Sequence, residues 1–278
     1  MDFRFNFGST TDTTMSNIKQ LKNASERKAV RHVFNPNFTN KWKHPFKEYT
    51  LDGKAMYYID PDEVSKEIQS EGDLECLSSS DLQSGEYEGG LKVWECTFDL
   101  LIYLNNNAEL LKGKRVLDLG CGAGLLGLFT YFLEAQEICW QDYNKEVVLN
   151  FTIPSVDCTM QKFNAPSHVK NKLTFLSGDW ENVSSFLSDN NFPKFDIILS
   201  SETIYNKEYY PKLLRILQDQ LQHDGMALFA AKTYYFGVGG GTNDFTAYIE
   251  KHGNYKVDLL QASSEGVKRE ILKVCKRV

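Results

Sequence analysis

The stretch Val116-Leu117-Asp118-Leu119-Gly120-Cys121-Gly122-Ala123-Gly124-Leu125-Leu126-Gly127 decides the fold of this chain. A short apolar run ends in an acid, small residues follow, and a second apolar run begins. This order is typical of a buried strand, a tight turn and a helix. Glycine lets the backbone turn sharply and approach a ligand, and the helix start presents unpaired N–H groups to it. The stretch therefore predicts a ligand-binding turn.

Two classes of ligand use such a turn. Gly122, Gly124 and Gly127 fit the dinucleotide spacing G-x-G-x-x-G, which is a weak signal by itself. Asp118, however, lies two residues before the first glycine, and a carboxylate at the strand tip repels a pyrophosphate. S-adenosylmethionine carries an ammonium group and a sulfonium, which suit such an acid. Asp118 therefore favours a methyltransferase and is our first predicted cofactor-binding residue.

Length and composition limit the class of protein. A chain of 278 residues with 42% hydrophobic content can bury one substantial core and a smaller appendage. The net charge of −6 gives no overall signature of a nucleic-acid-binding protein. No apolar run approaches the roughly 20 residues that span a bilayer. The six scattered cysteines include no C-x-x-C pair. We therefore expect no metal site, no membrane partner, a monomer, and a reducing compartment, cytoplasmic and/or nuclear.

Residues 1–80 differ from the rest and predict a largely low-order N-terminal arm. Between Lys19 and Lys47 eight Lys and Arg face one acid, a net +7. Aromatic residues interleaved with these cations over 34–58 suit ribosome or RNA contact. A flap that packs its aromatics on the domain is the plainer interpretation, and we favour it. Phe3, Phe5 and Phe7 alternate like a strand.

From residue 81 to 278 strands and helices alternate, which predicts one domain built on a parallel sheet. We expect helices over 93–104, 125–133, 144–151 (until Pro154), 207–221 (ended by a turn at 223–225) and 242–250. Seven strands are predicted over 115–119, 137–141, 173–176, 195–200, 226–231, 256–260 and 270–275. The last two form an antiparallel hairpin. The prediction is an α/β, Rossmann-like, seven-stranded S-adenosylmethionine-dependent methyltransferase fold with a partly disordered arm.

In such a sheet the ligand lies beyond the carboxyl ends of the strands. Asp142 follows the second strand and lies 22 residues after Gly120, close to the spacing of an acid that binds ribose hydroxyls. A helix cap is the alternative. Asp179 and Trp180 follow the third strand, and we predict that they hold the adenine rather than only form a turn. Trp94, in an apolar-striped helix, is by itself more typical of core.

The segment after the fourth strand is where the transferred group and its acceptor should meet. It contains Glu202, Tyr205 and Asn206. Glu202 and Tyr205 are three residues apart and can flank one acceptor on a helical turn; a plain helix start is an equal alternative. The [D/N]-P-P-[Y/F] signature of enzymes that methylate nucleobase amines is absent. The Gly-rich loop 234–241 follows the fifth strand and predicts backbone close to a peptide substrate, or a lid.

Several blocks together resemble the eukaryotic protein-histidine N-methyltransferase family. They are residues 1–7, 79–82, 85–101, 116–127, 141–144, 201–206 and 235–241. The Tyr87–Leu101 and Gly237–Gly241 blocks are the specific ones, whereas the glycine turn is shared by many methyltransferases. The resemblance covers about 80–278 and the extreme N-terminus, and residues 8–78 show little of it.

The resemblance implies methyl transfer from S-adenosylmethionine to a histidine of a protein substrate, the third protein of the large ribosomal subunit. We predict Glu202, Tyr205 and Asn206 as catalytic residues from their place after the fourth strand. The resemblance also moves Trp94 from core to cofactor contact. The cofactor-binding residues that it implies are Trp94, Glu95, Cys96, Thr97, Gly120, Gly122, Asp142, Tyr143, Asp179, Trp180 and Ser201. To these we add Asp118, Gln141 and Gly178, from the same strand ends and turns.

An imidazole acceptor needs little catalytic machinery, because a neutral histidine already offers an unprotonated nitrogen near pH 7. We therefore predict that Glu202 holds the other ring N–H and that Tyr205 and Asn206 position the ring. Two alternatives stay open. One is a protein-lysine methyltransferase, whose relatives usually carry Asp-x-x-Tyr after the fourth strand, where this chain has Glu202. The other is a non-catalytic ribosome-assembly factor that keeps the cofactor pocket.

Overall fold

The computed structural model describes residues 27–34, 44–71, 82–166, 169, 172–263 and 266–277. Their centre is an eight-stranded sheet with the order β1-β6-β5-β4-β7-β8-β10-β9. Its strands are β1 (Val30–His32), β4 (Arg115–Leu119), β5 (Glu137–Asp142), β6 (Leu173–Ser177), β7 (Phe195–Ser201), β8 (Leu221–Lys232), β9 (Tyr255–Ala262) and β10 (Arg269–Lys276). All seven predicted strands are present, and β1 adds an eighth.

Strands β4 to β8 pair in parallel, and β10 pairs antiparallel with both β8 and β9. The predicted fold class, mostly parallel with a C-terminal hairpin, is thus confirmed. The helices are α2 (Pro61–Glu71), α3 (Glu95–Asn106), α4 (Leu125–Phe132), α5 (Lys145–Val147), α6 (Ile153–Lys162), α7 (Trp180–Asp189), α8 (Tyr210–Gln220) and α9 (Thr242–His252), with single turns η3 (Ala108–Leu110), η4 (Val148–Thr152) and η6 (Lys207–Tyr209).

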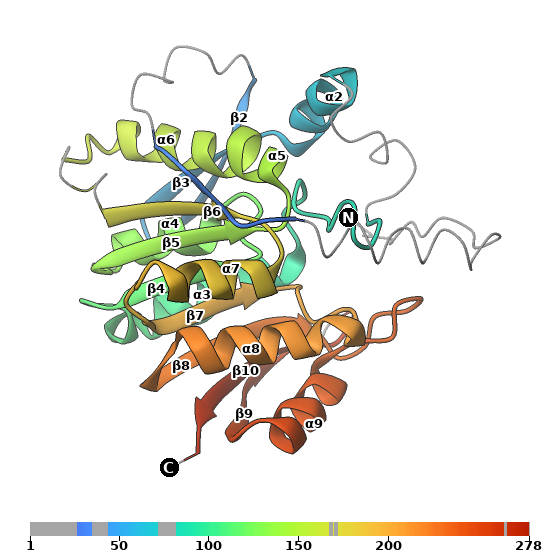
Figure 1. Ribbon diagram of the computed structural model, residues 1–278. Helices are drawn as coiled ribbons and strands as arrows, with labels where there is room; N and C mark the ends of the chain where they lie inside the picture. Colours follow the sequence, from blue (N-terminus) through green and yellow to red (C-terminus); the bar gives the residue numbers. More distant parts are fainter. Residues whose placement is uncertain are drawn as a thin grey trace.

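Helices cover both faces of the sheet (Figure 1). Successive residues of β4 point to opposite faces, so Val116 packs with α3, α4 and α6 while Leu117 packs with α7, α8 and α9. A strand buried on both faces needs a continuous apolar run, which explains why 116–119 reads as apolar apart from Asp118. None of the helices in these described ranges is long and apolar enough to cross a membrane.

The predicted low-order arm is wrong for residues 27–34 and 44–71. Strand β1 pairs with β6, and β2 (Phe46–Leu51) and β3 (Lys54–Ile59) form a hairpin whose Met56 and Ile59 are fully buried. The turn residues Asp52 and Gly53 both have positive φ, the arrangement of the Asp-Gly hairpin turn. The Asp52-Gly53 dipeptide is a sequence signal for this hairpin that our prediction did not include. The alternating residues Phe3, Phe5 and Phe7 lie outside the described part.

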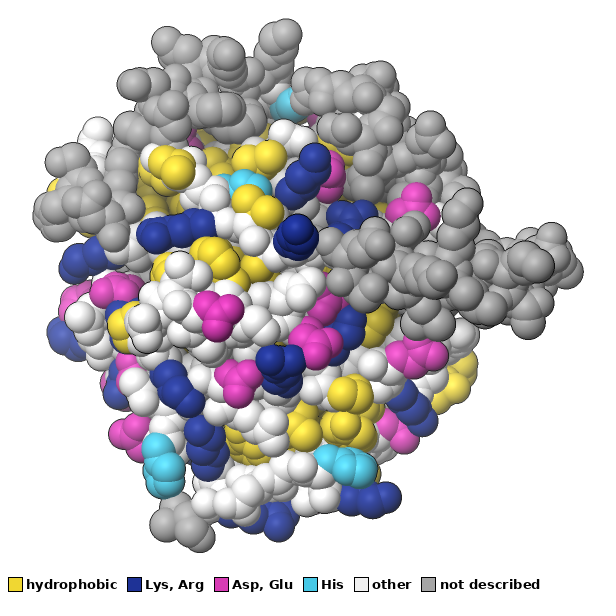
Figure 2. All heavy atoms as spheres, in the orientation of Figure 1, with side chains coloured by type: hydrophobic (Ala, Val, Ile, Leu, Met, Phe, Trp, Pro, Cys, Tyr) yellow, Lys and Arg dark blue, Asp and Glu magenta, His cyan; other side chains and the backbone are white. Residues whose placement is uncertain are grey.

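Aromatic side chains of the arm pack on the domain. Phe34 stacks on Phe175 with ring centroids 5.8 Å apart, and Tyr49 contacts Phe98 at 4.8 Å. Lys47, from the basic stretch, pairs with Asp60 at 2.9 Å. Basic and acidic side chains are interspersed on the face that Figure 2 shows. These contacts favour the packing-flap interpretation; RNA or ribosome contact stays a prediction.

Two predicted helix ends are corrected. Pro154 does not end the helix that starts near Asn144, because it lies in the first turn of α6, where its missing N–H costs nothing. The predicted turn at 223–225 is instead part of β8, which extends back to Leu221. The extra residues are absorbed where the β7–β8 register shifts between Phe195 and Ile197.

Candidate active site

A cleft opens at the carboxyl ends of β4, β5, β6 and β7, where the strand order reverses. It is walled on one side by a lead-in segment, residues 82–94, that precedes α3. The structure brings together in this cleft most of the predicted site residues: Trp94, Thr97, Gly120, Gly122, Asp142, Tyr143, Asp179, Trp180, Ser201, Glu202 and Tyr205.

The glycine turn is shaped by close backbone approaches. Gly122 has a φ of +50°, and a Cβ there would lie 2.9 Å from the carbonyl oxygen of Gly90 in the lead-in segment. Gly120 has a φ of +69°, and its Cβ would lie 2.6 Å from Cγ2 of Thr203. Only glycine fits both the conformation and the space, so the turn sits directly beneath the lead-in segment.

Asp118 does not line the cleft. It is buried behind the turn, where Oδ2 accepts the N–H of Gly127 at 2.9 Å and so fixes the start of α4. Its Oδ1 has no hydrogen-bond partner among the described residues. Burial raises the pKa of Asp118 to about 8. The predicted contact with a ligand ammonium is corrected here, because the side chain points to the helix rather than to the cavity.

Gln141 is also buried behind the cleft rather than on its wall. Its Oε1 accepts Nε1–H of Trp180 at 2.9 Å, and its Nε2 donates to the carbonyl of Gly178 at 2.9 Å. Gly178 therefore faces Gln141 and the backbone of residues 28–29 instead of the cavity. Both residues, predicted to bind cofactor, instead hold the post-β6 turn in place.

Asp142 closes the turn from β5. Its Oδ2 accepts the N–H of Gly122 at 3.0 Å and its Oδ1 accepts the N–H of Asn144 at 3.2 Å. Burial raises the pKa of Asp142 to about 6, although these backbone hydrogen bonds act to lower it. A Cβ on Gly90 would lie 3.0 Å from both carboxylate oxygens. Glycine at 90 thus leaves room for a ligand hydroxyl beside Asp142.

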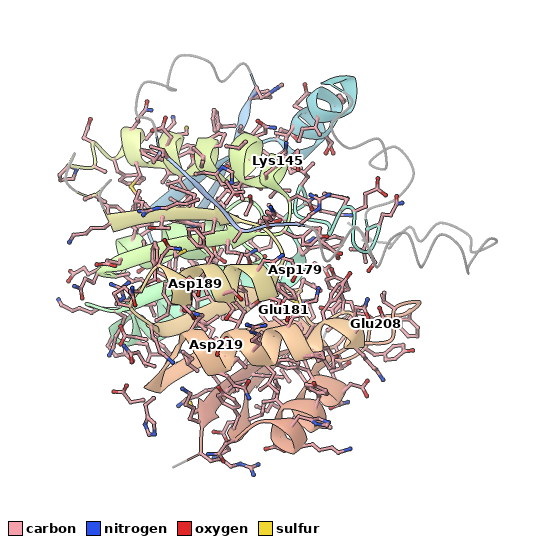
Figure 3. The ribbon with its side chains drawn as sticks, viewed as in Figure 1. Lys145, Asp179, Glu181, Asp189, Glu208 and Asp219 are labelled. Atoms are coloured by element: carbon pink, nitrogen blue, oxygen red, sulfur yellow. The ribbon has the colours of Figure 1, made fainter. Side chains whose placement is uncertain are left out.

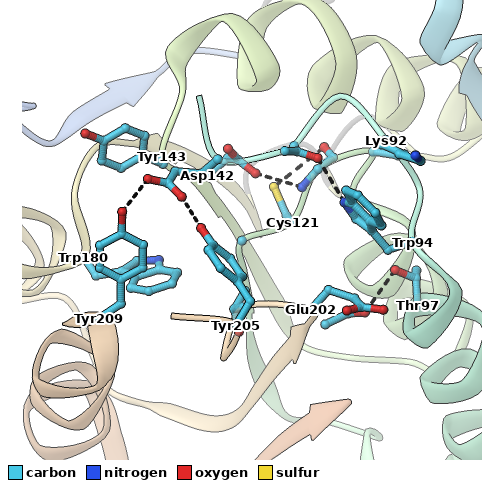
Figure 4. Close-up of a pocket in the computed structure, with 18 of the residues that line it drawn as sticks. Lys92, Trp94, Thr97, Cys121, Asp142, Tyr143, Trp180, Glu202, Tyr205 and Tyr209 are labelled. Atoms are coloured by element: carbon cyan, nitrogen blue, oxygen red, sulfur yellow. Dashed lines mark hydrogen bonds between the residues drawn. The ribbon is translucent and has the colours of Figure 1, made fainter. Parts of the chain in front are cut away.

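One end of the cleft is aromatic and contains a short ion pair. Asp179 caps α7 by accepting the N–H of Glu181 at 3.0 Å and pairs with Lys212 of α8. Trp180 meets Tyr209 edge to face at 6.1 Å. Figure 4 shows Tyr143, Trp180 and Tyr209 together at this end, with Asp142 beside them. A flat, polar-edged ligand such as a purine suits these walls.

Glu88 was not predicted, although it lies in the lead-in segment. Its carboxylate accepts the hydroxyls of Tyr205 and, at 2.7 Å, of Tyr209, together with the N–H of Gly85. Burial raises the pKa of Glu88 and places that of Tyr205 well above its usual value. This cluster fastens the lead-in segment to the segments after β7. Its residues are distant in sequence, so no local pattern announced it.

Glu202 lies at the opposite end of the cleft, near Trp94 and Thr97 (Figure 4). Its side chain is 4% exposed; Oε2 accepts the hydroxyl of Tyr235, and Oε1 lies 3.8 Å from Nζ of Lys232. That Oε1 accepts no hydrogen bond from the described part of the chain. The backbone of Glu202 has a φ of +58°, which is strained for a residue with a side chain.

Three further predicted residues lie outside the cleft. Asn206 caps η6 by accepting the N–H of Glu208 at 3.0 Å, Glu95 lies 3.9 Å from Arg269, and Cys96 is buried within α3. The pKa of the Cys96 thiol is raised well above its usual value, mainly by burial and secondly by the nearby carboxylate of Glu202. Helical direction explains the misses at Glu95 and Cys96, because only Trp94 and Thr97 of 94–97 face the cavity.

The comparisons with known proteins agree with the geometry of the cleft. The model of the family described as "Lysine methyltransferase" matches residues 79–249, the span that holds the whole cleft. The chain belongs to this family. A histidine protein methyltransferase 1 homolog from Bos taurus is 42% identical to this chain over 216 residues, covering 71% of the chain and 58% of the relative.

The histidine protein methyltransferase 1 of Saccharomyces cerevisiae is 26% identical to this chain, and the alignment covers 96% of the chain and 86% of that relative. The predicted resemblance is thus confirmed, although the chain spans only 58% of the length of the Bos taurus protein. A putative S-adenosylmethionine-dependent methyltransferase of known structure from Streptococcus mutans has a TM-score of 0.54 at 15% identity, covering 83% of this chain and 56% of that one. That likeness concerns the fold.

Proposed function

We propose that this protein transfers a methyl group from S-adenosylmethionine to a ring nitrogen of a histidine in a protein substrate. The observation that carries the proposal is Glu202, a buried carboxylate at one end of the cleft whose Oε1 accepts no hydrogen bond from the described residues. The names of the relatives from Bos taurus and Saccharomyces cerevisiae support histidine as the acceptor.

The cleft residues fit this cofactor. Asp142 presents its carboxylate beneath Gly90, where no Cβ blocks the approach of ribose hydroxyls. Asp179, Trp180 and Tyr209 supply the purine site at the same end. When bound, S-adenosylmethionine supplies a methyl group activated by its sulfonium. The cleft extends from Asp142 to Glu202. A methyl donor bound at the Asp142 end and an acceptor bound at the Glu202 end can therefore lie in line.

Glu202 acts on the acceptor ring. Its carboxylate accepts the N–H of the imidazole, which leaves the other ring nitrogen unprotonated and aimed along the cleft. The negative charge offsets the positive charge that the ring gains as it becomes methylated. Tyr235 holds Oε2 of Glu202, so the side chain is oriented before the substrate arrives. The strained backbone at 202 is consistent with a residue fixed for function.

The direct test uses labelled S-adenosylmethionine with paired peptides that carry histidine or lysine at one position, read by mass spectrometry. We expect one methyl group on histidine and none on lysine. Methylation of lysine, up to three times, would favour the protein-lysine alternative. No transfer to ribosomal proteins from a strain lacking this protein, with the cofactor bound, would favour the non-catalytic alternative.

The target we propose is the third protein of the large ribosomal subunit, in the cytoplasm or the nucleus. Its support is the family resemblance of the 85–101 and 235–241 blocks. The same mass-spectrometric experiment names the modified residue, so it tests the target together with the acceptor.

Cofactor affinity should depend on pH through Asp142. Since burial raises the pKa of Asp142 to about 6, its carboxylate is ionised above that pH and protonated below it. Ribose hydroxyls donate to the ionised form, so affinity falls as pH decreases, by up to about tenfold per unit below 6. Calorimetric titration with S-adenosylhomocysteine between pH 5 and 8 measures this. A flat profile, or the same slope in Asp142→Asn, would contradict the assignment.

The loop after β8 presents two aromatic side chains beside the acceptor end. The N–H of Gly240 donates to the carbonyl of Tyr205 at 2.9 Å, and a Cβ at 240 would lie 2.4 Å from that carbonyl group. The loop is thus seated against the cleft, while Tyr234 and Phe236 touch each other and are 46% and 76% exposed. We propose that the substrate polypeptide packs on this pair.

Phe236→Ala should therefore raise the KM for the protein substrate roughly fivefold and leave kcat unchanged. Its exposed ring contributes little to folding, so thermal stability should not change. Phe163→Ala, which removes another exposed phenylalanine away from the cleft, is the control. Steady-state kinetics with the full protein substrate measure the effect; equal KM values for the two variants would argue against docking here.

A further inference from the structure

Arg27 joins three segments that build the cofactor end of the cleft, although it precedes the family-matched region by more than fifty residues. Its Nη2 donates to the carbonyl of Glu86 in the lead-in segment at 2.9 Å. Its guanidinium lies over the ring of Tyr143, after β5, at 4.8 Å from the centroid. Its own carbonyl accepts the N–H of Asp179, after β6, at 3.2 Å.

We propose that Arg27 is a positioning residue for cofactor binding, which holds in place the residues at the cofactor end of the cleft. This inference rests on the proposed function. Arg27 does not line the cavity, so it acts through residues that do, Tyr143 and Asp179. Glu86 lies two residues from Glu88, the acid that fastens the lead-in segment. Release of Arg27 would therefore loosen this end of the cleft from two sides.

The backbone after Arg27 is fixed firmly enough for this role. The carbonyl of Arg27 also accepts Nδ2–H of Asn182 at 2.8 Å, and β1 pairs Val30 with Ser177 at the edge of the sheet (Figure 1). A Cβ on Gly178 would lie 2.7 Å from the carbonyl oxygen of Lys28. Because residue 178 is glycine, the N-terminal segment at Lys28 can pack directly against the turn that precedes Asp179.

The positive charge of Arg27 contributes to this role, in addition to the planar shape of its guanidinium. Glu146 in α5 is buried, and its Oε2 has no hydrogen-bond partner among the described residues. Nη1 of Arg27 lies 4.0 Å from that oxygen, and Lys145 lies 3.6 Å from the other. A buried acid needs a nearby cation, and only a planar guanidinium can at the same time stack on Tyr143 and donate to Glu86.

The test measures binding of S-adenosylhomocysteine to the full chain by calorimetry. We expect Arg27→Ala to weaken binding about tenfold and Arg27→Lys, which keeps the charge, about threefold. The KM for S-adenosylmethionine should rise in proportion, while kcat at saturating cofactor and the KM for protein substrate stay unchanged. A residue that only stabilises the fold would not change the KM for S-adenosylmethionine separately from kcat and from the KM for protein substrate.

Arg31→Ala is the matched control, because Arg31 lies four residues after Arg27, in β1, with its guanidinium over Phe192, away from the cleft. Its binding should stay within about twofold of the unsubstituted chain. Unchanged binding by Arg27→Ala, or an equal loss in Arg31→Ala, would overturn the inference. If Arg27→Ala does not fold, unchanged binding by Arg27→Lys with an equal kcat would overturn it. An unsubstituted chain that binds no cofactor would instead contradict the proposed function, and the inference with it.

Discussion

Glu202→Gln should lower the single-turnover rate of histidine methylation about 100-fold, with cofactor bound normally. Glutamine has the size of glutamate and can still accept the hydroxyl of Tyr235, so the acceptor end keeps its shape. What is lost is the negative charge that offsets the charge gained by the ring. Rapid-quench measurement with labelled S-adenosylmethionine, at saturating substrate, isolates this step.

The matched control for this prediction is Glu208→Gln, because Glu208 is exposed on η6 and its side chain lies outside the cleft. Its rate should equal that of the unsubstituted protein. Full methylation by Glu202→Gln would remove Glu202 from the mechanism and leave alignment of the two substrates as the main source of catalysis.

Asp142→Ala should weaken binding of S-adenosylhomocysteine about 100-fold, the second large effect. Hydrogen bonds to a charged acceptor contribute about 1.5–3 kcal/mol, and the substitution removes those of the ribose hydroxyls. It also removes the acceptor that fixes the N–H of Gly122. Equilibrium dialysis or calorimetry at pH 7.5 measures the loss, and saturating cofactor should restore much of kcat.

Asp189→Ala is the control for Asp142→Ala. Figure 3 shows Asp189 at the end of α7 away from Asp179, and it is exposed. Asp142→Asn adds a finer comparison, because it keeps an oxygen for Gly122 while losing the charge. Binding by Asp142→Ala within threefold of the unsubstituted protein would show that Asp142 only caps a helix, the alternative considered from the sequence.

The sequence predicted the cleft well where residues directly follow strands. Asp142, Asp179 and Glu202 each come after a parallel strand, and parallel strands end at one edge of the sheet, so their side chains must gather there. The limit of that reasoning is side-chain direction. Asp118 lies one residue before the end of β4 and points behind the turn to Gly127. A one-residue step along a strand reverses the face, and the sequence does not state where the strand ends.

Contacts between distant segments were beyond prediction. Glu88, Tyr209 and Lys212 line the cleft because the lead-in segment, η6 and α8 fold over it, and no spacing along the chain encodes that approach. Arg27 was counted as one of eight cations of a basic arm, whereas it is bound to Glu86 and Tyr143. A cation in a polar segment looks the same in sequence whether it meets solvent or a buried partner.

The pairing of β1 with β6 has a consequence for synthesis. His32 and Ser177, which are hydrogen-bonded across this edge, are 145 residues apart. At about 5–20 residues per second, a ribosome needs roughly 7–30 s to make the intervening chain. The N-terminal strand must therefore wait without its partner while the first parallel strands are made. The cofactor end of the cleft also contains Tyr209 and Lys212, so it is complete only after residue 212 has been made, and the proposed donor site forms late in synthesis.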